Sequence, residues 1–253
     1  AVKDTGLGNV ADKIQKNERK TMGLLRDLQG LRTVGVIAEH PELGITEIAR
    51  PAGVVAAVTP STNPGATPAN KIINALKCRN AVILAPSPKG FNTGALLLGF
   101  MHAELGKVGA PRDLVQILPE PVTKDATQEL MRQADLTVAT GSQANVRAAY
   151  SSGKPAFGVG LGNVSVIIDT TADVDDAAAK ICASKCFDNA TSCSSENSLV
   201  IVAPVWDAML AALTRAGGVL LSAAEKAQLQ NAMWRAGKLS GDVMARPVSD
   251  IVA

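Results

Sequence analysis

The feature that most constrains the fold is an alternation beginning at Pro51, where short apolar runs are each followed by a segment of helical length. Strands that are apolar throughout are typical of a parallel sheet, because the crossover helices bury both of its faces. We therefore predict an α/β fold with a Rossmann-like, doubly wound parallel sheet over residues 51–160. The runs are GVVAAVT (53–59), NAVILA (80–85), LVQILP (114–119) and LTVAT (136–140).

Three further elements flank this sheet. Residues 8–30 carry apolar side chains at helical spacing, which predicts a surface helix within the N-terminal segment 1–32. Between residues 33 and 50, two strand-like runs surround HPELG, whose Pro and Gly favour a turn, so we predict a β-hairpin arm. After Gly162, the run VSVIID and a helix capped near Asp173 predict the start of a second α/β domain over residues 161–253.

The overall composition excludes several classes of partner. The formal net charge is +2 without a long run of one sign, so we expect no nucleic acid partner. The longest apolar stretches are shorter than the roughly 20 residues that span a bilayer, so we expect no membrane association. The N-terminal residues AVKDTGLGNV have neither an initiator Met nor a signal-peptide pattern, so secretion is not expected and we interpret this end as cut.

The cysteines and histidines indicate neither disulfides nor a metal. Four cysteines without a C-x-x-C pair do not form a disulfide framework, and His40 and His102 are far from them in sequence. A reducing, cytoplasmic setting without a bound metal is the expectation. Cys182 and Cys186 recur on the apolar stripe of the helix that follows Asp173, so we predict that both fill the core, and Cys78 is also interpreted as structural.

Cys193 differs from the other cysteines because it follows the predicted helix in ATSCSSEN, among hydroxyl side chains. Taken alone, such a thiol is either a small structural residue or a nucleophile. Motifs elsewhere in the chain bear on this choice. They are TGLGNVADKI (5–14), PAGVVAAVTPSTNP (51–64), RNAVILAPSPKG (79–90), ATGSQANVRAAY (139–150), GVGLGNVSVIID (158–169) and FDNATSCSSENSLVIV (187–202).

In this order, these motifs resemble the aldehyde dehydrogenase superfamily, in particular its coenzyme A-acylating branch. The resemblance implies that Cys193 is the catalytic nucleophile, which forms a thiohemiacetal and then a thioester with the substrate. It also implies that the amide of Asn63, with the backbone N–H of Cys193, stabilises the developing oxyanion. Thr62 is the alternative to Asn63, because the alignment at STNP can shift by one position.

The resemblance further implies a site for NAD or NADP. Gly141 and Ser142 follow a predicted strand and open a helix, where backbone N–H groups can bind a pyrophosphate. Thr59, Pro60 and Ser87 match positions along the adenosine and nicotinamide-ribose side of the cofactor. Ordinary turn chemistry is the alternative for the glycine. The choice between NAD and NADP stays open, because Ala85 occupies the position of the family's lysine.

One departure from the family determines the expected reaction. Hydrolytic members have a glutamate in an E-L-G-G motif that activates water, and the corresponding residues here are Gly160–Asn163, GLGN. Without that base, the acyl-enzyme should persist until a thiol attacks it, since thiolates attack thioesters without strong general-base help. We therefore predict coenzyme A as the co-substrate. Glu196, three residues after Cys193, is a weaker candidate for a replacement base.

The expected protein is thus an NAD(P)-dependent, acylating aldehyde dehydrogenase for a small aldehyde such as acetaldehyde, succinate semialdehyde or sulfoacetaldehyde. Two alternatives are a hydrolytic aldehyde dehydrogenase that yields the free acid and a non-catalytic dinucleotide-binding or assembly fragment. Family members are considerably longer than this chain, so we interpret it as partial, with residues 51–160 as the NAD(P)-binding domain and 161–253 as part of the catalytic domain. The resemblance also implies a homodimer or homotetramer, with residues 33–50 as its oligomerisation arm.

Overall fold

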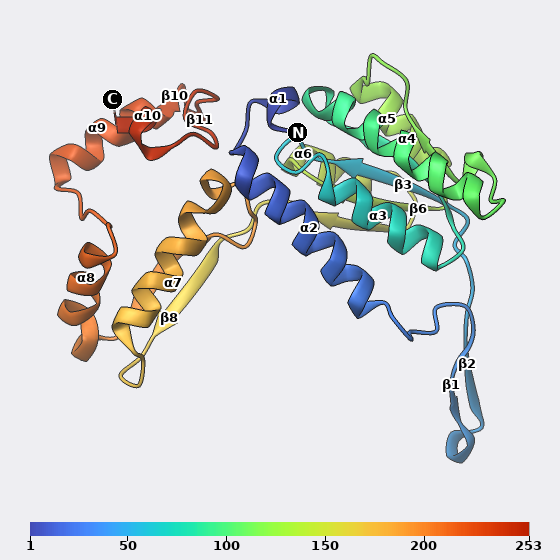
Figure 1. Ribbon diagram of the computed structural model, residues 1–253, viewed down its shortest axis with the longest axis horizontal. Coiled ribbons are helices and arrows are strands. Elements are labelled where there is room, and N and C mark those ends of the chain that lie inside the picture. Colours follow the sequence, from blue (N-terminus) through green and yellow to red (C-terminus); the bar gives the residue numbers. More distant parts are fainter. Residues whose placement is uncertain (253) are drawn as a thin grey trace. The chain divides into compact units, whose positions relative to one another are not determined.

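The computed structural model describes residues 1–252, which form two compact units (Figure 1). The first unit comprises Ala1–Gly6 and Ile14–Leu161, and the second comprises Leu7–Lys13 and the chain from Gly162 onward. Helix α2 (Val10–Asp27) therefore begins in the second unit and continues in the first. None of the helices in the described part of the chain is long and apolar enough to cross a membrane.

The first unit contains a five-stranded sheet in the order β5-β4-β3-β6-β7, in which every neighbouring pair is parallel. The predicted α/β fold with a doubly wound parallel sheet is confirmed. Its strands are β3 (Val54–Thr59), β4 (Ala81–Pro86), β5 (Val115–Ile117), β6 (Leu136–Thr140) and β7 (Ala156–Val159). Its helices besides α2 are α1 (Val2–Thr5), α3 (Ala66–Lys77), α4 (Phe91–Lys107), α5 (Lys124–Gln133) and α6 (Gln143–Tyr150).

The core lies on both faces of this sheet, as the apolar strands require. Alternate residues of β3 point to opposite faces. Val55 and Ala57 pack in a cluster with α3 and α4, whereas Ala56 and Val58 pack in a cluster with α5 and α6. The sheet is thus the middle of three layers, and its strand ends are the places where the chain changes layer.

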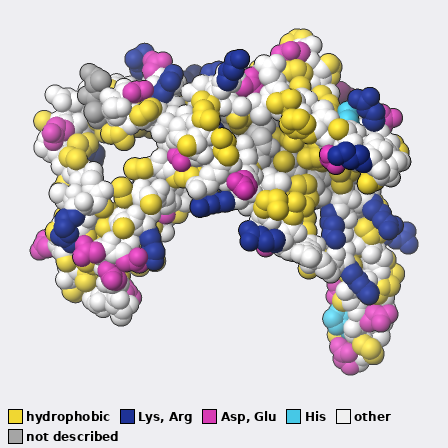
Figure 2. Space-filling model, in the orientation of Figure 1, with side chains coloured by type: hydrophobic (Ala, Val, Ile, Leu, Met, Phe, Trp, Pro, Cys, Tyr) yellow, Lys and Arg dark blue, Asp and Glu magenta, His cyan; other side chains and the backbone are white. Residues whose placement is uncertain are grey.

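The predicted β-hairpin arm is confirmed. Strands β1 (Gly35–His40) and β2 (Ile45–Ala49) pair antiparallel across a short 3-10 turn, Pro41–Leu43, and the hairpin projects from the sheet in Figure 1. Apolar side chains remain exposed along it, next to charged ones (Figure 2). They include Val36, Ile37, Leu43, Ile45 and Ile48.

The second unit is also α/β. Its strands β8 (Val164–Ile168) and β9 (Glu196–Ile201) pair parallel, and helices α7 (Val174–Cys186) and α8 (Trp206–Arg215) form a core cluster with them. The predicted strand VSVIID and the helix capped by Asp173 are both present, and the Asp173 side chain accepts a hydrogen bond from Asp176 N. The remaining elements are α9 (Ala223–Met233), β10 (Trp234–Arg235), β11 (Lys238–Leu239) and α10 (Val248–Val252).

Candidate active site

The first unit has a topological switch point between β3 and β6. The chain runs outward from β3 to β4 and β5, then returns to the other side of β3 with β6 and β7. In open α/β sheets, ligands bind in the crevice outside the carboxyl ends of the strands at this point. The segments that follow β3 and β6 begin at Pro60 and Gly141, and both were predicted to contact a cofactor.

Thr59, Pro60 and Ser87 are brought together at this edge. Thr59 is the last residue of β3, and its carbonyl oxygen accepts a 3.0 Å hydrogen bond from the backbone N–H of Ser87, just after β4. The side chain of Thr59 is buried, whereas Pro60 and Ser87 are half-buried. This bond continues the β3–β4 ladder by one residue and fixes Ser87 against the end of β3.

Gly141 and Ser142 form the turn from β6 into α6. Gly141 has φ +156°, a conformation that L side chains rarely adopt, and its N–H donates to the carbonyl of Val159. Ser142 is the N-cap of α6, because its Oγ accepts a 3.3 Å hydrogen bond from Asn145 N. The helix thus begins at the carboxyl edge of the sheet, where its N-terminal N–H groups can bind an anion.

Asn63 lies in the loop between β3 and α3 and is only 8% exposed. Its Oδ1 is buried and makes no hydrogen bond within the described residues. A buried amide oxygen without a partner is uncommon and marks a place where another group can bind. Thr62, the alternative residue, is half-buried in the same loop.

Lys71 on α3 is a residue at the switch point that no sequence motif indicated. Its Nζ donates to the carbonyl oxygens of Val58 on β3 and Val138 on β6, at 2.5 and 2.7 Å. Burial lowers the pKa of Lys71 to about 7. The sequence could have indicated this role, because Lys71 lies between Pro68 and Ala75 on the buried face of the helix. A cation in such a place needs polar partners.

Cys193 is in the second unit, exposed in the turn between α7 and β9. The predicted placement after a helix and before a strand is confirmed. Helix α7 ends at Cys186, a 3-10 turn covers Phe187–Ala190, and β9 begins at Glu196. Ser195 Oγ and Glu196 Oε2 are buried, and neither has a hydrogen-bond partner in the part of the chain that the structure describes.

The prediction that Cys186 fills the core is wrong. Cys186 is exposed at the last turn of α7, a helix in which only Ala178 is fully buried. Burial of the sulfur and then the neighbouring Cys182 raise the pKa of the Cys186 thiol. Cys182 and Cys78 are half-buried, and the thiol of Cys182 donates to the carbonyl of Ala216. All four cysteines are free.

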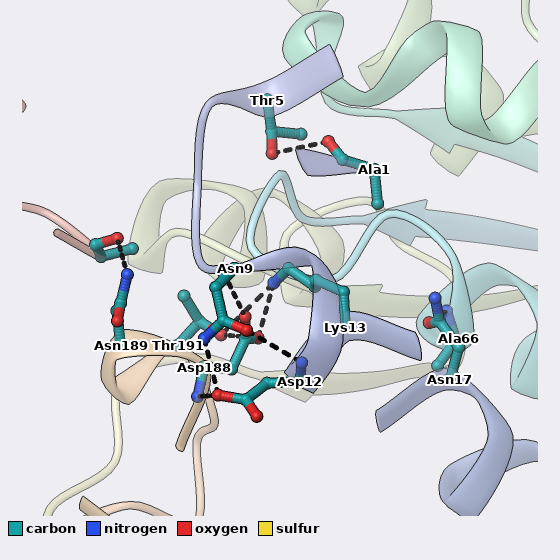
Figure 3. Close-up of polar contacts among 11 residues, drawn as sticks. Ala1, Thr5, Asn9, Asp12, Lys13, Asn17, Ala66, Asp188, Asn189 and Thr191 are labelled. Carbon is teal, nitrogen blue, oxygen red and sulfur yellow. Dashed lines mark hydrogen bonds and ion pairs between the residues drawn. The ribbon is translucent and has the colours of Figure 1, made fainter. Parts of the chain in front are cut away.

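Asp188, five residues before Cys193, is a second residue whose role no sequence motif indicated. It is fully buried, and its carboxylate pairs with Lys13 at 2.7 Å (Figure 3). The motif TGLGNVADKI is thereby given a structural role, because four of its residues surround Asp188. They are Gly8, Asn9, Asp12 and Lys13.

Gly160, which we predicted to stand at the position of the family's glutamate, directly follows β7 and is half-buried. Its φ lies outside the left-handed region. A glycine has no group that could activate water.

The donors at the carboxyl edge of the first unit fit a dinucleotide. The N-terminus of α6 suits a phosphate, and the polar groups after β3 and β4 suit ribose hydroxyls. The unpartnered amide oxygen of Asn63 adds a polar group that remains available there. Among the described residues, no group of three or more His, Cys, Asp or Glu side chains could hold a metal ion.

Comparison with known proteins identifies the family. The profile described as "Aldehyde dehydrogenase family" matches residues 8–226. The chain belongs to the aldehyde dehydrogenase family. The sulfoacetaldehyde dehydrogenase (acylating) of Cupriavidus necator is 70% identical over 251 residues, which cover 99% of this chain and 51% of that protein. The chain thus spans about half of the length of the curated sulfoacetaldehyde dehydrogenases that it matches.

Solved aldehyde dehydrogenases share the fold. An acetylating aldehyde dehydrogenase from Geobacillus thermoglucosidasius is 36% identical, with a TM-score of 0.92 over 99% of this chain and 56% of that one. A propionaldehyde dehydrogenase from Rhodopseudomonas palustris, whose structure contains CoA and an acylated cysteine, is 31% identical. Its TM-score is 0.78, over 93% of this chain and 53% of that one.

Proposed function

We propose that the protein oxidises a small aldehyde with NAD(P)⁺ and transfers the acyl group to coenzyme A. The observation that carries this proposal is Gly160, which leaves no carboxylate at the position where hydrolytic relatives have their base. A thioester without such a base hydrolyses slowly, because general-base assistance is worth typically 10²- to 10⁴-fold. A thiol is then the competent acceptor.

In the proposed reaction, the thiolate of Cys193 attacks the aldehyde carbon and forms a thiohemiacetal. Bound NAD(P)⁺ would supply the hydride acceptor, and loss of the hydride from that carbon would leave a thioester on Cys193. The thiol of coenzyme A then attacks the thioester, and Cys193 departs as the thiolate. The sum is aldehyde, NAD(P)⁺ and coenzyme A giving acyl-coenzyme A, NAD(P)H and a proton.

Other residues of the chain are proposed to assist these steps. The amide of Asn63 and the backbone N–H of Cys193 are proposed to donate hydrogen bonds to the oxyanion of the thiohemiacetal. The α6 N-terminus at Gly141 and Ser142 is proposed to bind the pyrophosphate of the cofactor. Thr59, Pro60 and Ser87 are proposed to line the adenosine and nicotinamide-ribose side of the cofactor.

Sulfoacetaldehyde is the substrate that we propose, because the 70% identical relative carries that name. The cofactor is NAD or NADP. We propose that residues 51–160 act as the cofactor domain and the chain from 161 as catalytic. We also propose that the protein is a homodimer or homotetramer with the hairpin at an interface. A cytoplasmic setting is proposed because it suits four free cysteines.

The test measures reduced cofactor formed by the full-length protein with sulfoacetaldehyde and NAD⁺ or NADP⁺, first without coenzyme A. We expect about one equivalent of NAD(P)H per active site and almost no further NAD(P)H formation after that. Adding coenzyme A should restore turnover and produce sulfoacetyl-coenzyme A, identified by mass spectrometry. Succinate semialdehyde and acetaldehyde serve as comparison substrates.

Sustained turnover to the free acid without coenzyme A would contradict the proposal and favour the hydrolytic alternative. Glu196 would then be the base to examine, since one of its carboxylate oxygens is buried without a partner among the described residues. Glu196→Gln would abolish that hydrolysis. A protein that binds NAD(P)⁺ but never reduces it would favour the non-catalytic alternative.

A further inference from the structure

A buried ion pair joins the start of the chain to the segment that carries Cys193. Lys13 Nζ lies 2.7 Å from Asp188 Oδ2, and the two side chains are 3% and 0% exposed. The residues are 175 positions apart in sequence, and both belong to the second unit. Removing one partner of a buried pair leaves an uncompensated charge, so the two residues depend on each other.

The rest of the Asp188 carboxylate is also occupied (Figure 3). Oδ1 accepts a 3.2 Å hydrogen bond from Asn9 N, and Oδ2 accepts one from Thr191 Oγ1. The N–H of Asp188 donates to Asp12 Oδ2 at 2.7 Å. Gly8 approaches so closely that a Cβ there would lie 2.0 Å from Oδ1. The segment 8–13 therefore contacts both the carboxylate and the backbone N–H of Asp188.

The backbone at Asp188 is strained. Asp188, Asn189 and Ala190 have φ values of 53°, 50° and 58°, which place three consecutive non-glycine residues in the left-handed region. Such residues persist only where the surroundings hold them, and they cluster at functional sites. Here the contacts of Asp188, and a 3.1 Å bond from Asn189 Nδ2 to the carbonyl of Ala245, hold them.

Cys193 follows this segment by only three residues. Thr191 connects the two parts, since its hydroxyl donates to Asp188 and accepts from Lys13 Nζ at 3.3 Å. The next turn is closed by the Ser195 N–H donating to the Ser192 carbonyl. The buried pair and the Thr191 hydroxyl therefore hold the chain up to two residues before Cys193.

We propose that Lys13, Asp188 and Thr191 form a latch of positioning residues that aligns the Cys193 thiol for attack on the aldehyde. This inference rests on the proposed role of Cys193 as the nucleophile. A nucleophile displaced by about 1 Å can lose about 10²-fold in rate. The latch acts on the step at the thiol, whereas cofactor affinity depends on other residues.

The decisive variants are at Thr191, because they leave the buried ion pair intact. Thr191→Val removes the hydroxyl at nearly constant volume, and Thr191→Ser retains it. In the full-length protein, we expect Thr191→Val to lower kcat by about 10- to 100-fold, with KM for NAD(P)⁺ changed less than about twofold. Thr191→Ser should restore most of kcat. Asp175→Asn, which breaks the exposed ion pair with Arg215 in the same unit, is the control and should leave kcat unchanged.

Each variant is normalised to folded active sites by thermal unfolding and by titration of Cys193 with iodoacetamide. Lys13→Met should show the same loss of kcat per folded site, together with a lower Tm. If Thr191→Val and Lys13→Met lower only Tm and keep kcat per folded site, the latch is merely structural and the inference fails. If Cys193→Ser itself turns over normally, the proposed function fails first, whatever the Thr191 variants do.

Discussion

Gly160 lies directly against Gln143, and a Cβ atom at Gly160 would be 2.5 Å from Oε1 of that glutamine. The neighbour is the end of a flexible side chain on α6, and φ of Gly160 lies outside the left-handed region. A side chain at position 160 is therefore opposed by this movable group and, at 3.3 Å, by Cγ2 of the buried Val146, but not by its own backbone. The position that we propose to separate acylating from hydrolytic chemistry can thus accept a side chain if Gln143 and Val146 shift.

We expect Gly160→Glu to gain hydrolysis of the acyl-enzyme. General bases contribute typically 10²- to 10⁴-fold, so the rate of free-acid formation without coenzyme A should rise by at least about tenfold. Combining it with Gln143→Ala should raise the rate further, because the blocking oxygen is removed. Gly160→Gln is the control of the same shape without a base. Equal rates for the Glu and Gln variants would contradict the assignment of this position.

Cys193 should be the only cysteine whose loss abolishes aldehyde oxidation. Cys186 is the matched control, because it is also exposed in the second unit, and burial with the neighbouring Cys182 raises its pKa. Cys193→Ser should lower kcat by orders of magnitude with Tm nearly unchanged. Cys186→Ser should retain the kcat of the unaltered protein. Mass spectrometry after brief iodoacetamide treatment should find Cys193 modified first. Normal turnover by Cys193→Ser would refute its role.

The sequence was sufficient to predict the sheet as far as β6 but not β7. Strands β3 to β6 lie in mainly apolar runs that alternate with helical segments, although β5 contains Gln116 and β6 contains Thr137. In β7, Gly158 interrupts the apolar run, and a glycine in such a position is typical of a turn. The structure gives another reason for this glycine, because a Cβ would lie 2.7 Å from Val146 and 2.8 Å from Tyr150 on α6. Close packing of a helix, and not a turn, requires Gly158.

The contacts around Cys193 were beyond prediction for a different reason. Sequence position indicated a thiol off the apolar stripe, and the structure places it in a turn. The pairing of Lys13 with Asp188 joins residues 175 positions apart, and no local spacing encodes it. The exposure of Cys186 was missed because helical periodicity identifies the apolar face of a helix. It does not show at which residue other elements cease to cover that face.

The hairpin of β1 and β2 should pair with another subunit. Isolated two-stranded hairpins are marginal in water, and this one exposes Leu43, Ile45 and Ile48 by 66%, 50% and 57%. We expect Ile48→Lys to yield smaller oligomers by light scattering at micromolar concentration. Glu42→Lys, at the tip where a charged side chain already stands, should leave the assembly intact. A monomeric unaltered protein would contradict the proposed arm.

Lys71 should make stability depend on pH. Its pKa falls from about 10.4 when unfolded to about 7 when folded, because burial disfavours the ammonium. Between these values the unfolded chain binds a proton that the folded one does not, so the free energy of unfolding rises with pH, by at most about 1.4 kcal/mol per unit. Below pH 7 both states are protonated and this dependence ends.

Comparison with Lys71→Met isolates the effect, because other titrating groups cancel in the difference. Urea unfolding at pH 7, 8, 9 and 10 should show the unaltered protein gaining stability relative to Lys71→Met at each step. Lys107→Met, at an exposed lysine of α4, is the control for loss of a positive charge outside the core. The hydrogen bonds to Val58 and Val138 oppose the trend, since they favour the charged amine. A flat difference for Lys71→Met would mean that these two carbonyls keep the ammonium charged at the switch point.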